Sequence, residues 1–154
     1  MTFFAKFHPL IVHFPVALLT SGVVFEIYGS FKKDEVVETA GRFNTRLGFW
    51  CIFPVLIVGF LGMLSLDKTD EFKDFLSGHL RFAFLTAGTF IVAMLTSRYL
   101  RNKFGRAVYL LALIAGLYCI LNTGYYGGEL VHRFVFRPDN NFLKFFPKKL
   151  IGIL

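Results

Sequence analysis

The segment PLIVHFPVALLTSGVVFEIYG, residues 9–29, decides the fold class because it is apolar over the length of a membrane-spanning helix. A helix rises about 1.5 Å per residue, so about 20 apolar residues cross a hydrocarbon core of roughly 30 Å. Three more such segments follow: LGFWCIFPVLIVGFLGMLSL at 47–66, HLRFAFLTAGTFIVAMLTSRYL at 79–100 and AVYLLALIAGLYCILNTGYYGGELVHRF at 107–134. We therefore predict an all-α integral membrane protein with four spans.

The connections between the predicted spans are short, and they set the predicted topology. They are FKKDEVVETAGRFNTR at 31–46, DKTDEFKDFLSG at 67–78 and RNKFGR at 101–106. Short connections favour antiparallel neighbours, which predicts an up-down-up-down four-helix bundle over residues 1–135. In residues 136–154 aromatic side chains alternate with lysines, and this pattern predicts a tail that lies in the membrane interface or docks on a partner.

The composition agrees with a membrane protein and argues against a nucleic-acid-binding one. Hydrophobic residues make up 55% of the chain and charged residues 18%, against about a quarter charged in soluble domains. The net charge of +7 comes from Lys and Arg between the apolar segments, so we expect the lipid bilayer as a partner and no nucleic acid. Cys51 and Cys119 lie in apolar segments without a CxxC or CxxCH context, which is typical of small core residues.

The four histidines fall where the predicted topology brings them to one membrane surface. His8 and His13 lie at the start of the first span, His79 begins the third, and His132 lies near the end of the fourth. In an up-down-up-down bundle the start of the first span, the start of the third and the end of the fourth lie at the same membrane surface. A histidine within a span is uncommon enough to indicate function, although a single one near a surface more often contacts headgroups or water.

The basic residues predict which surface carries the histidines. The connections at the opposite surface hold Lys32, Lys33, Arg42, Arg46, Arg98, Arg101, Lys103 and Arg106. The N-terminus and the 67–78 connection hold only Lys6, Lys68 and Lys73. By the positive-inside rule, the basic surface faces the cytoplasm, so the histidines and both termini are predicted to be extracytoplasmic.

A cofactor inside the bundle explains the converging histidines better than chance does. Imidazole binds haem iron, zinc, copper and non-haem iron. The glycines of GYYGG, residues 124–128, favour haem because Gly127 and Gly128 offer a flat surface to a planar ring one turn before His132. Close helix packing explains these glycines nearly as well.

The side chains around the histidines also suit an apolar macrocycle. The expected aromatic lining is Phe7, Phe14, Phe82, Phe84, Tyr125 and Tyr126. Arg81 and Arg133 are placed to meet haem propionates at the interface, where an unpaired arginine is also ordinary. Glu129 and His132 form the E-x-x-H spacing of di-iron bundles, but such sites need a second motif and further carboxylates. We therefore interpret Glu129 as a group that either positions a metal-binding side chain or binds a proton.

The stretch HPLIVHFPVALL, residues 8–19, resembles the HPxxVHFPxAL signature of a bacterial domain-of-unknown-function family of four-helix membrane proteins. Members are suspected to bind haem b and often occur with planctomycete-type c-type cytochromes. GHLRFAF at 78–84 is similar to the family's H-R-W type stretch, and GGELVH at 127–132 to its GGxLTH or GGxLVY ending. The resemblance covers roughly residues 7–134.

This resemblance implies haem b bound by His8, His13, His79 and His132 in the bacterial cytoplasmic (inner) membrane. One departure is at the fourth span, where some members have Tyr in place of His132 and a histidine where this chain has Phe134. Spans one and three are diagonal in a simple bundle, so we expect His13 and His79 to hold one haem. His8 and His132 then remain for a second haem or for positioning.

The predicted function is that of a membrane-bound b-type cytochrome, more an electron-transfer subunit than an enzyme on its own. It would connect the quinone pool with an extracytoplasmic carrier such as a c-type cytochrome, inside a larger redox complex, with the cofactor supplying the chemistry. Two alternatives stay open: a cofactor-free structural subunit of a membrane complex, and a small proton or solute transporter that uses His13 and Glu129.

Overall fold

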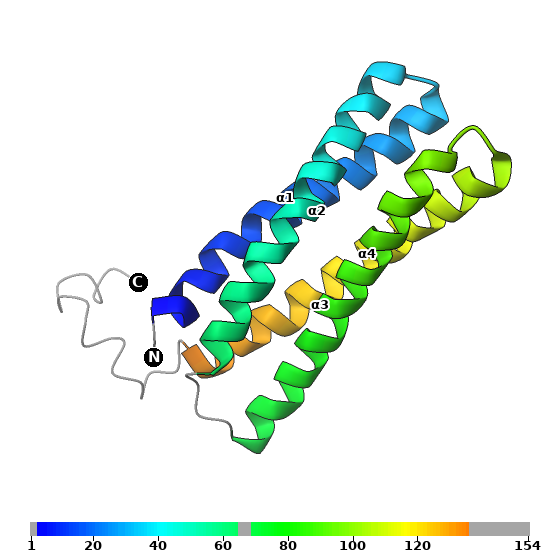
Figure 1. Ribbon diagram of the computed structural model, residues 1–154. Helices are drawn as coiled ribbons and strands as arrows, with labels where there is room; N and C mark the ends of the chain where they lie inside the picture. The colour runs from blue at the N-terminus through cyan, green and yellow to red at the C-terminus, as the bar shows by residue number, and fades with distance from the viewer. Residues whose placement is uncertain (1–2, 65–68, 136–154) are drawn as a thin grey trace.

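A computed structural model describes residues 3–64 and 69–135 as four long helices that lie side by side (Figure 1). The helices are α1 (Phe3–Lys32), α2 (Glu35–Met63), α3 (Asp70–Thr96) and α4 (Lys103–Leu130), with a 3-10 turn η1 (Ser97–Tyr99) after α3 and a π-helical turn η2 (Val131–Val135) after α4. The part of the chain that the structure describes contains no strand, and successive helices run in opposite directions. The predicted all-α, up-down-up-down bundle is confirmed.

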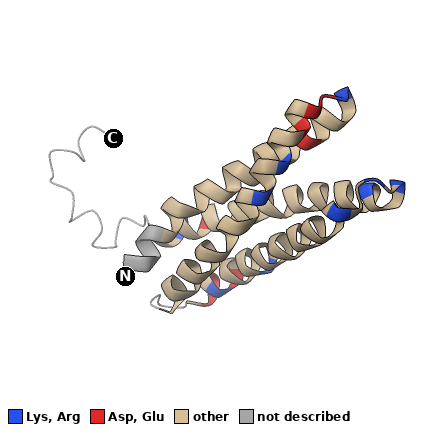
Figure 2. Ribbon diagram, turned by 45° about the horizontal axis from the view of Figure 1, so that its top comes forward, with Lys and Arg blue, Asp and Glu red and all other residues tan. Residues whose placement is uncertain are grey.

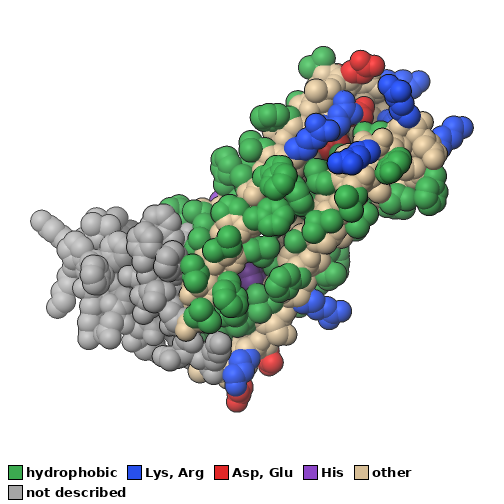
Figure 3. Space-filling view, in the orientation of Figure 1, with side chains coloured by type: hydrophobic (Ala, Val, Ile, Leu, Met, Phe, Trp, Pro, Cys, Tyr) green, Lys and Arg blue, Asp and Glu red, His purple; other side chains and the backbone are tan. Residues whose placement is uncertain are grey.

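All four helices are long and apolar enough to cross a membrane. Their most apolar windows have mean hydropathies of 1.6 to 1.9. The face of the bundle seen in the space-filling view is dominated by hydrophobic side chains (Figure 3), and lipid tails would cover such a surface. The tail predicted at 136–154 lies outside the described residues.

The prediction that residues 31–46 form a connection is wrong, because α2 begins at Glu35. The Asp34 carboxylate caps this helix by accepting hydrogen bonds from the backbone N–H groups of Val36 and Val37, both at 3.1 Å. The turn before it consists of Lys33 and Asp34. Lys33 has a left-handed backbone with φ of 57°, and the N–H of Asp34 donates to the carbonyl of Gly29 at 2.9 Å.

The third helix also begins earlier than predicted, at Asp70 instead of residue 79. Thr69 caps it by accepting a hydrogen bond from the N–H of Phe72 at 3.3 Å. The prediction failed for a physical reason: hydropathy marks the length of chain that can face lipid, whereas helices continue into the polar interface wherever a cap starts them. The connection between α3 and α4 is correspondingly shorter than 101–106, since α4 begins at Lys103.

The bundle consists of two tight hairpins, α1 with α2 and α3 with α4, which contact each other less than their own helices do. Glycines let α1 and α2 approach closely. A Cβ atom at Gly41 would lie 2.6 Å from the Cγ and the backbone N of Glu26, and one at Gly22 would lie 2.5 Å from the Thr45 Oγ1. Small residues at such crossings are the usual way in which membrane helices pack.

An apolar core joins the two hairpins in the middle of the bundle. Leu19 and Val23 of α1, Phe90 of α3 and Leu113 of α4 are almost completely buried there. Gly116 lets the Phe90 ring reach the α4 backbone, since a Cβ at this glycine would lie 2.7 Å from the ring. The hairpins are therefore held together by a dry central layer.

The two ends of the bundle differ in their elements and charges. One end, here called the turn end, holds the short connections within the hairpins. The other, here called the histidine end, holds the start of α1, the end of α2, the start of α3 and the end of α4 (Figure 1). Lys and Arg gather at both hairpin tips, with acidic residues beside them only at the tip of α1 and α2, while most of the length between the ends is uncharged (Figure 2).

Candidate functional site

Two histidines from diagonal helices meet inside the histidine end. The centroids of the His8 ring on α1 and the His79 ring on α3 are 6.3 Å apart, and the ring planes are almost perpendicular, at 89°. Both side chains are at least half-buried. The pair therefore bridges the two halves of the bundle.

His79 is oriented by the neighbouring helix of its own hairpin. Its Nδ1 lies 3.0 Å from the backbone carbonyl of Thr123 on α4, and because a carbonyl only accepts, Nδ1 carries the proton. Nε2 is then a lone-pair donor. Histidines that bind metals are commonly held in this way, with one ring nitrogen on a backbone carbonyl and the other on the metal.

His8 has unused hydrogen-bonding capacity. Its Nδ1 is buried and makes no hydrogen bond of ordinary geometry with any residue that the structure describes, although the backbone carbonyl of Val55 lies nearby. Buried polar atoms nearly always have partners, so an exception indicates a site that binds something or moves.

Each histidine packs against a glycine from the second helix of its hairpin. A Cβ at Gly59 of α2 would lie 2.8 Å from the His8 Cε1, and a Cβ at Gly127 of α4 would lie 3.2 Å from the His79 ring. A larger residue at either position would push the imidazole out of place. The two hairpins thus repeat one arrangement, with a histidine on the first helix and a glycine beneath it on the second.

His13 and His132 differ from this pair because both are exposed. His13 is exposed, and its Nδ1 donates to the carbonyl of Pro9 at 2.6 Å on the same helix. Five residues correspond to a rotation of about 140° around a helix, so His8 and His13 cannot both face the bundle interior. His132 lies on the π-helical turn η2 and is exposed as well. The structure brings together His8 and His79, not His13 and His79.

The other predicted site residues are divided between the site and the surface. Gly127 contacts His79, whereas a Cβ at Gly128 would meet nothing within 4 Å. Arg81 is exposed. Arg133 forms ion pairs with Glu129 and with Glu71, the latter at 3.5 Å.

The aromatic lining is smaller than predicted. Phe82 and Tyr126 are half-buried and stacked, with ring centroids 5.7 Å apart and an interplanar angle of 17°. Phe14, Phe84 and Tyr125 are exposed on the outside of the bundle, and the side chain of Phe7 lies outside the described residues. The stacked pair closes α3 against α4 beside His79, since Tyr126 also packs on Gly78.

A second polar cluster, which the sequence analysis missed, lies toward the turn end. Glu26 of α1 is only 2% exposed, and its carboxylate accepts hydrogen bonds from the hydroxyl of Thr45 at 2.6 Å and from that of Tyr109 at 2.5 Å. The signal for it was available, because Glu26 is the one acidic residue in the first apolar segment. An ionisable residue in a membrane span is a functional candidate.

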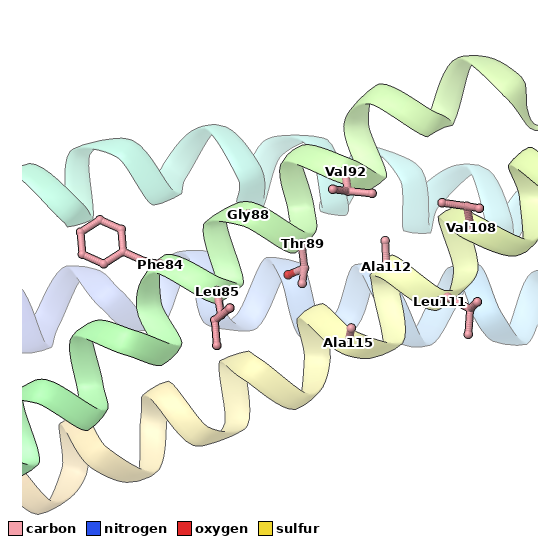
Figure 4. Close-up of a pocket in the computed structure, with 9 residues that line it drawn as sticks. All are labelled: Phe84, Leu85, Gly88, Thr89, Val92, Val108, Leu111, Ala112 and Ala115. Carbon is pink, nitrogen blue, oxygen red and sulfur yellow. The ribbon is translucent and has the colours of Figure 1, made fainter.

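An open groove of about 600 Å³ runs between α3 and α4, away from both clusters. Its lining is almost entirely apolar, with Phe84, Leu85 and Val92 contributed by α3 and Val108, Leu111 and Ala115 by α4 (Figure 4). None of the histidines contributes to it, so the groove is no part of the His8–His79 site.

Ligand number limits what the site can bind. Within 3–64 and 69–135, no three His, Cys, Asp or Glu side chains are grouped so that they could hold a metal ion. A structural zinc site needs four protein ligands and a catalytic one three, whereas the planar macrocycle of haem supplies four ligands itself and needs only one or two from the protein. The paired imidazoles therefore fit haem better than a bare metal ion.

Comparison with known proteins gives a family and no characterised relative. No curated protein and no solved structure matches the chain. One protein family, described as "Predicted membrane protein (DUF2231)", matches residues 5–139 and so covers the four helices. The chain belongs to this family of predicted membrane proteins of unknown function.

Proposed function

We propose that the protein is a membrane-bound b-type cytochrome in which His8 and His79 would hold one haem. The observation that carries this proposal is the pairing of the two rings across the hairpins, 6.3 Å apart between centroids. Metal–nitrogen bonds of about 2 Å on opposite sides of one iron atom imply centroids roughly 6 Å apart, so the pair has a suitable separation.

The chain's own residues prepare this site. The Thr123 carbonyl fixes the tautomer and orientation of His79 and increases the basicity of its other nitrogen. Gly59 and Gly127 let α2 and α4 come up to the imidazoles without displacing them. The apolar surroundings would keep water from the rings, and the neighbouring groups would tune the reduction potential of a haem bound there.

Haem held by both imidazoles would supply one-electron redox chemistry, with no site left for oxygen to bind. This favours electron transfer over oxygen chemistry. Because the pair lies at one end of the bundle only, we infer a carrier between the quinone pool and a c-type cytochrome or another redox subunit at the histidine end. The resemblance of HPLIVHFPVALL to its family signature supports the same role, in a bacterial cytoplasmic membrane with the histidine end outside.

The roles of the other predicted residues change in this proposal. His13 and His132, both exposed at the histidine end, are candidates for a second haem shared with a partner subunit rather than for the first. Arg81 is the better candidate for a propionate contact, because Arg133 is already paired with Glu129 and Glu71. No structural observation favours the scaffold or the transporter alternative.

The test is a reduced-minus-oxidised optical spectrum of detergent-purified protein made in haem-replete cells, with haem measured per chain. We expect a b-type spectrum that is lost in His8→Ala and in His79→Ala and kept in the matched control His13→Ala. A folded wild-type protein without haem would refute the cytochrome proposal. Loss in His13→Ala with retention in His8→Ala would refute the ligand assignment alone.

A further inference from the structure

Glu26 is a buried carboxyl group that the proposed electron transfer does not use. It lies on α1, eighteen residues beyond His8, which corresponds to about 27 Å along the helix. Its two oxygens are held by hydroxyl groups from two other helices, Thr45 on α2 and Tyr109 on α4. Three helices and both hairpins therefore meet at this one side chain.

The charged groups that face Glu26 do not neutralise it by direct contact. Arg42 and Glu38 of α2 act on it with opposite signs, and these two side chains form an ion pair with each other at 2.7 Å. Arg46 of α2 lies close enough to act on Tyr109. Arg106 of α4 donates instead to Ser30 at 2.7 Å. Among the described residues, no cation comes within ion-pairing distance of the Glu26 carboxylate.

Hydroxyl partners allow the carboxyl to exist in either protonation state. A hydroxyl can donate a hydrogen bond to a carboxylate, and after rotation it can accept one from a carboxylic acid. Arginine partners would permit only the ionised form, because a guanidinium cannot accept. Thr45 and Tyr109 thus keep Glu26 hydrogen-bonded whether or not it carries a proton.

The packing around Glu26 is tight on the side that faces Gly41, and the cluster offers few oxygen ligands. A Cβ atom at Gly41 would lie 2.6 Å from the Glu26 Cγ, so not even a methyl group fits on that side. The cluster offers oxygens from three residues, whereas Ca²⁺ and Mg²⁺ take about six or more oxygen ligands. A proton is the cation that this site can take up.

We propose that Glu26 is a reversible proton-binding site at the turn-end half of the bundle. In the step, a hydronium ion gives its proton to a Glu26 carboxylate oxygen and leaves as water, and no electron moves. The proton does not continue to the histidine end, since Leu19, Val23, Phe90 and Leu113 form a dry layer on that side. This proposal goes beyond the cytochrome proposal and needs no cofactor.

The first experiment is an infrared titration of the protein in lipid nanodiscs from about pH 4 to about pH 9, the range in which protein carboxyls titrate. We expect a carboxylic acid C=O band that appears reversibly as the pH falls, is absent in Glu26→Gln and remains in the matched control Glu38→Gln. The proposal is overturned if wild-type and Glu26→Gln spectra change identically with pH.

Two further measurements keep the proposal testable if Glu26→Gln fails to fold. Tyr109→Phe removes one hydrogen bond without adding volume, and it should shift both the frequency of the band and its titration midpoint. An unchanged band would contradict the assignment to Glu26.

In vesicles with an imposed pH gradient, the wild-type protein should not speed the collapse of the gradient. A collapse faster than in protein-free vesicles would show a continuous proton path and overturn the confined site.

Discussion

Replacing Gly41 with alanine tests the close approach of α1 and α2 directly. The new Cβ would lie 2.6 Å from two atoms of Glu26 and 2.9 Å from the carbonyl of Gly22, where ordinary contacts are 3.4–4 Å. Two of these three neighbours are backbone atoms, which cannot rotate away. The helices must therefore separate, and the Thr45–Glu26 hydrogen bond between them must lengthen.

The size of the effect follows from two opposing terms. Overpacking in a close-packed interior costs about 1–3 kcal/mol, and alanine gains about 0.5–1 kcal/mol over glycine in a helix. Gly88→Ala is the matched control, because the new Cβ would meet nothing within 4 Å. This variant therefore has the stabilisation that alanine gives a helix, without the steric overlap. We expect Gly41→Ala to be less stable than Gly88→Ala by about 2 kcal/mol.

The assay uses the buried thiol of Cys119, which is 7% exposed, as the reporter of unfolding. Cys51 is partly exposed and is first replaced by serine in every variant. A thiol-reactive dye then follows thermal unfolding in detergent. If Gly41→Ala unfolds at or above the temperature of Gly88→Ala, the described packing of α1 on α2 is wrong.

Three further predictions concern the helix ends. Lys33→Gly should raise the unfolding temperature in the same assay, by an amount equivalent to about 1 kcal/mol, because φ of 57° strains a residue that has a Cβ; an unchanged temperature would contradict a left-handed turn. Asp34→Ala should cost about 1 kcal/mol through loss of the α2 cap, and Asp34→Asn should recover most of it if capping is the cause. Glu71→Gln should leave the unfolding temperature close to that of the wild type, because its ion pair with Arg133 is exposed; a large fall would show that η2 depends on this contact.

The number and direction of the helices could be predicted from the sequence, whereas the ends of α2 and α3 could not. The capping residues Asp34 and Thr69 are ordinary polar residues in sequence, and only the structure shows which of several candidates starts a helix. Residues 35–46 were assigned to a connection because they are polar. In the structure their polarity reflects position near the membrane surface, not the absence of a helix.

The gathering of histidines at one end was also predictable, but the choice of pair was not. Helical periodicity already separates His8 from His13 by about 140°, so only one of them could face His79. Which one does so depends on how far α1 is rotated, and that is set by the close packing at Gly22 and Gly41. Glu26 was missed because a lone acidic residue lowers the mean hydropathy of a long apolar segment too little to stand out.

The contact of Glu26 with both hairpins has a consequence for how the protein is made. Each hairpin has a short turn, so α1 enters the bilayer with α2, and α3 follows with α4. Thr45 reaches Glu26 as soon as the first pair is inserted, whereas Tyr109 arrives only with the last helix to be synthesised. Until then one carboxyl oxygen lacks its donor within lipid, which is costly. Biogenesis therefore ends with a step that satisfies this group, and a chain that stops before α4 keeps the defect.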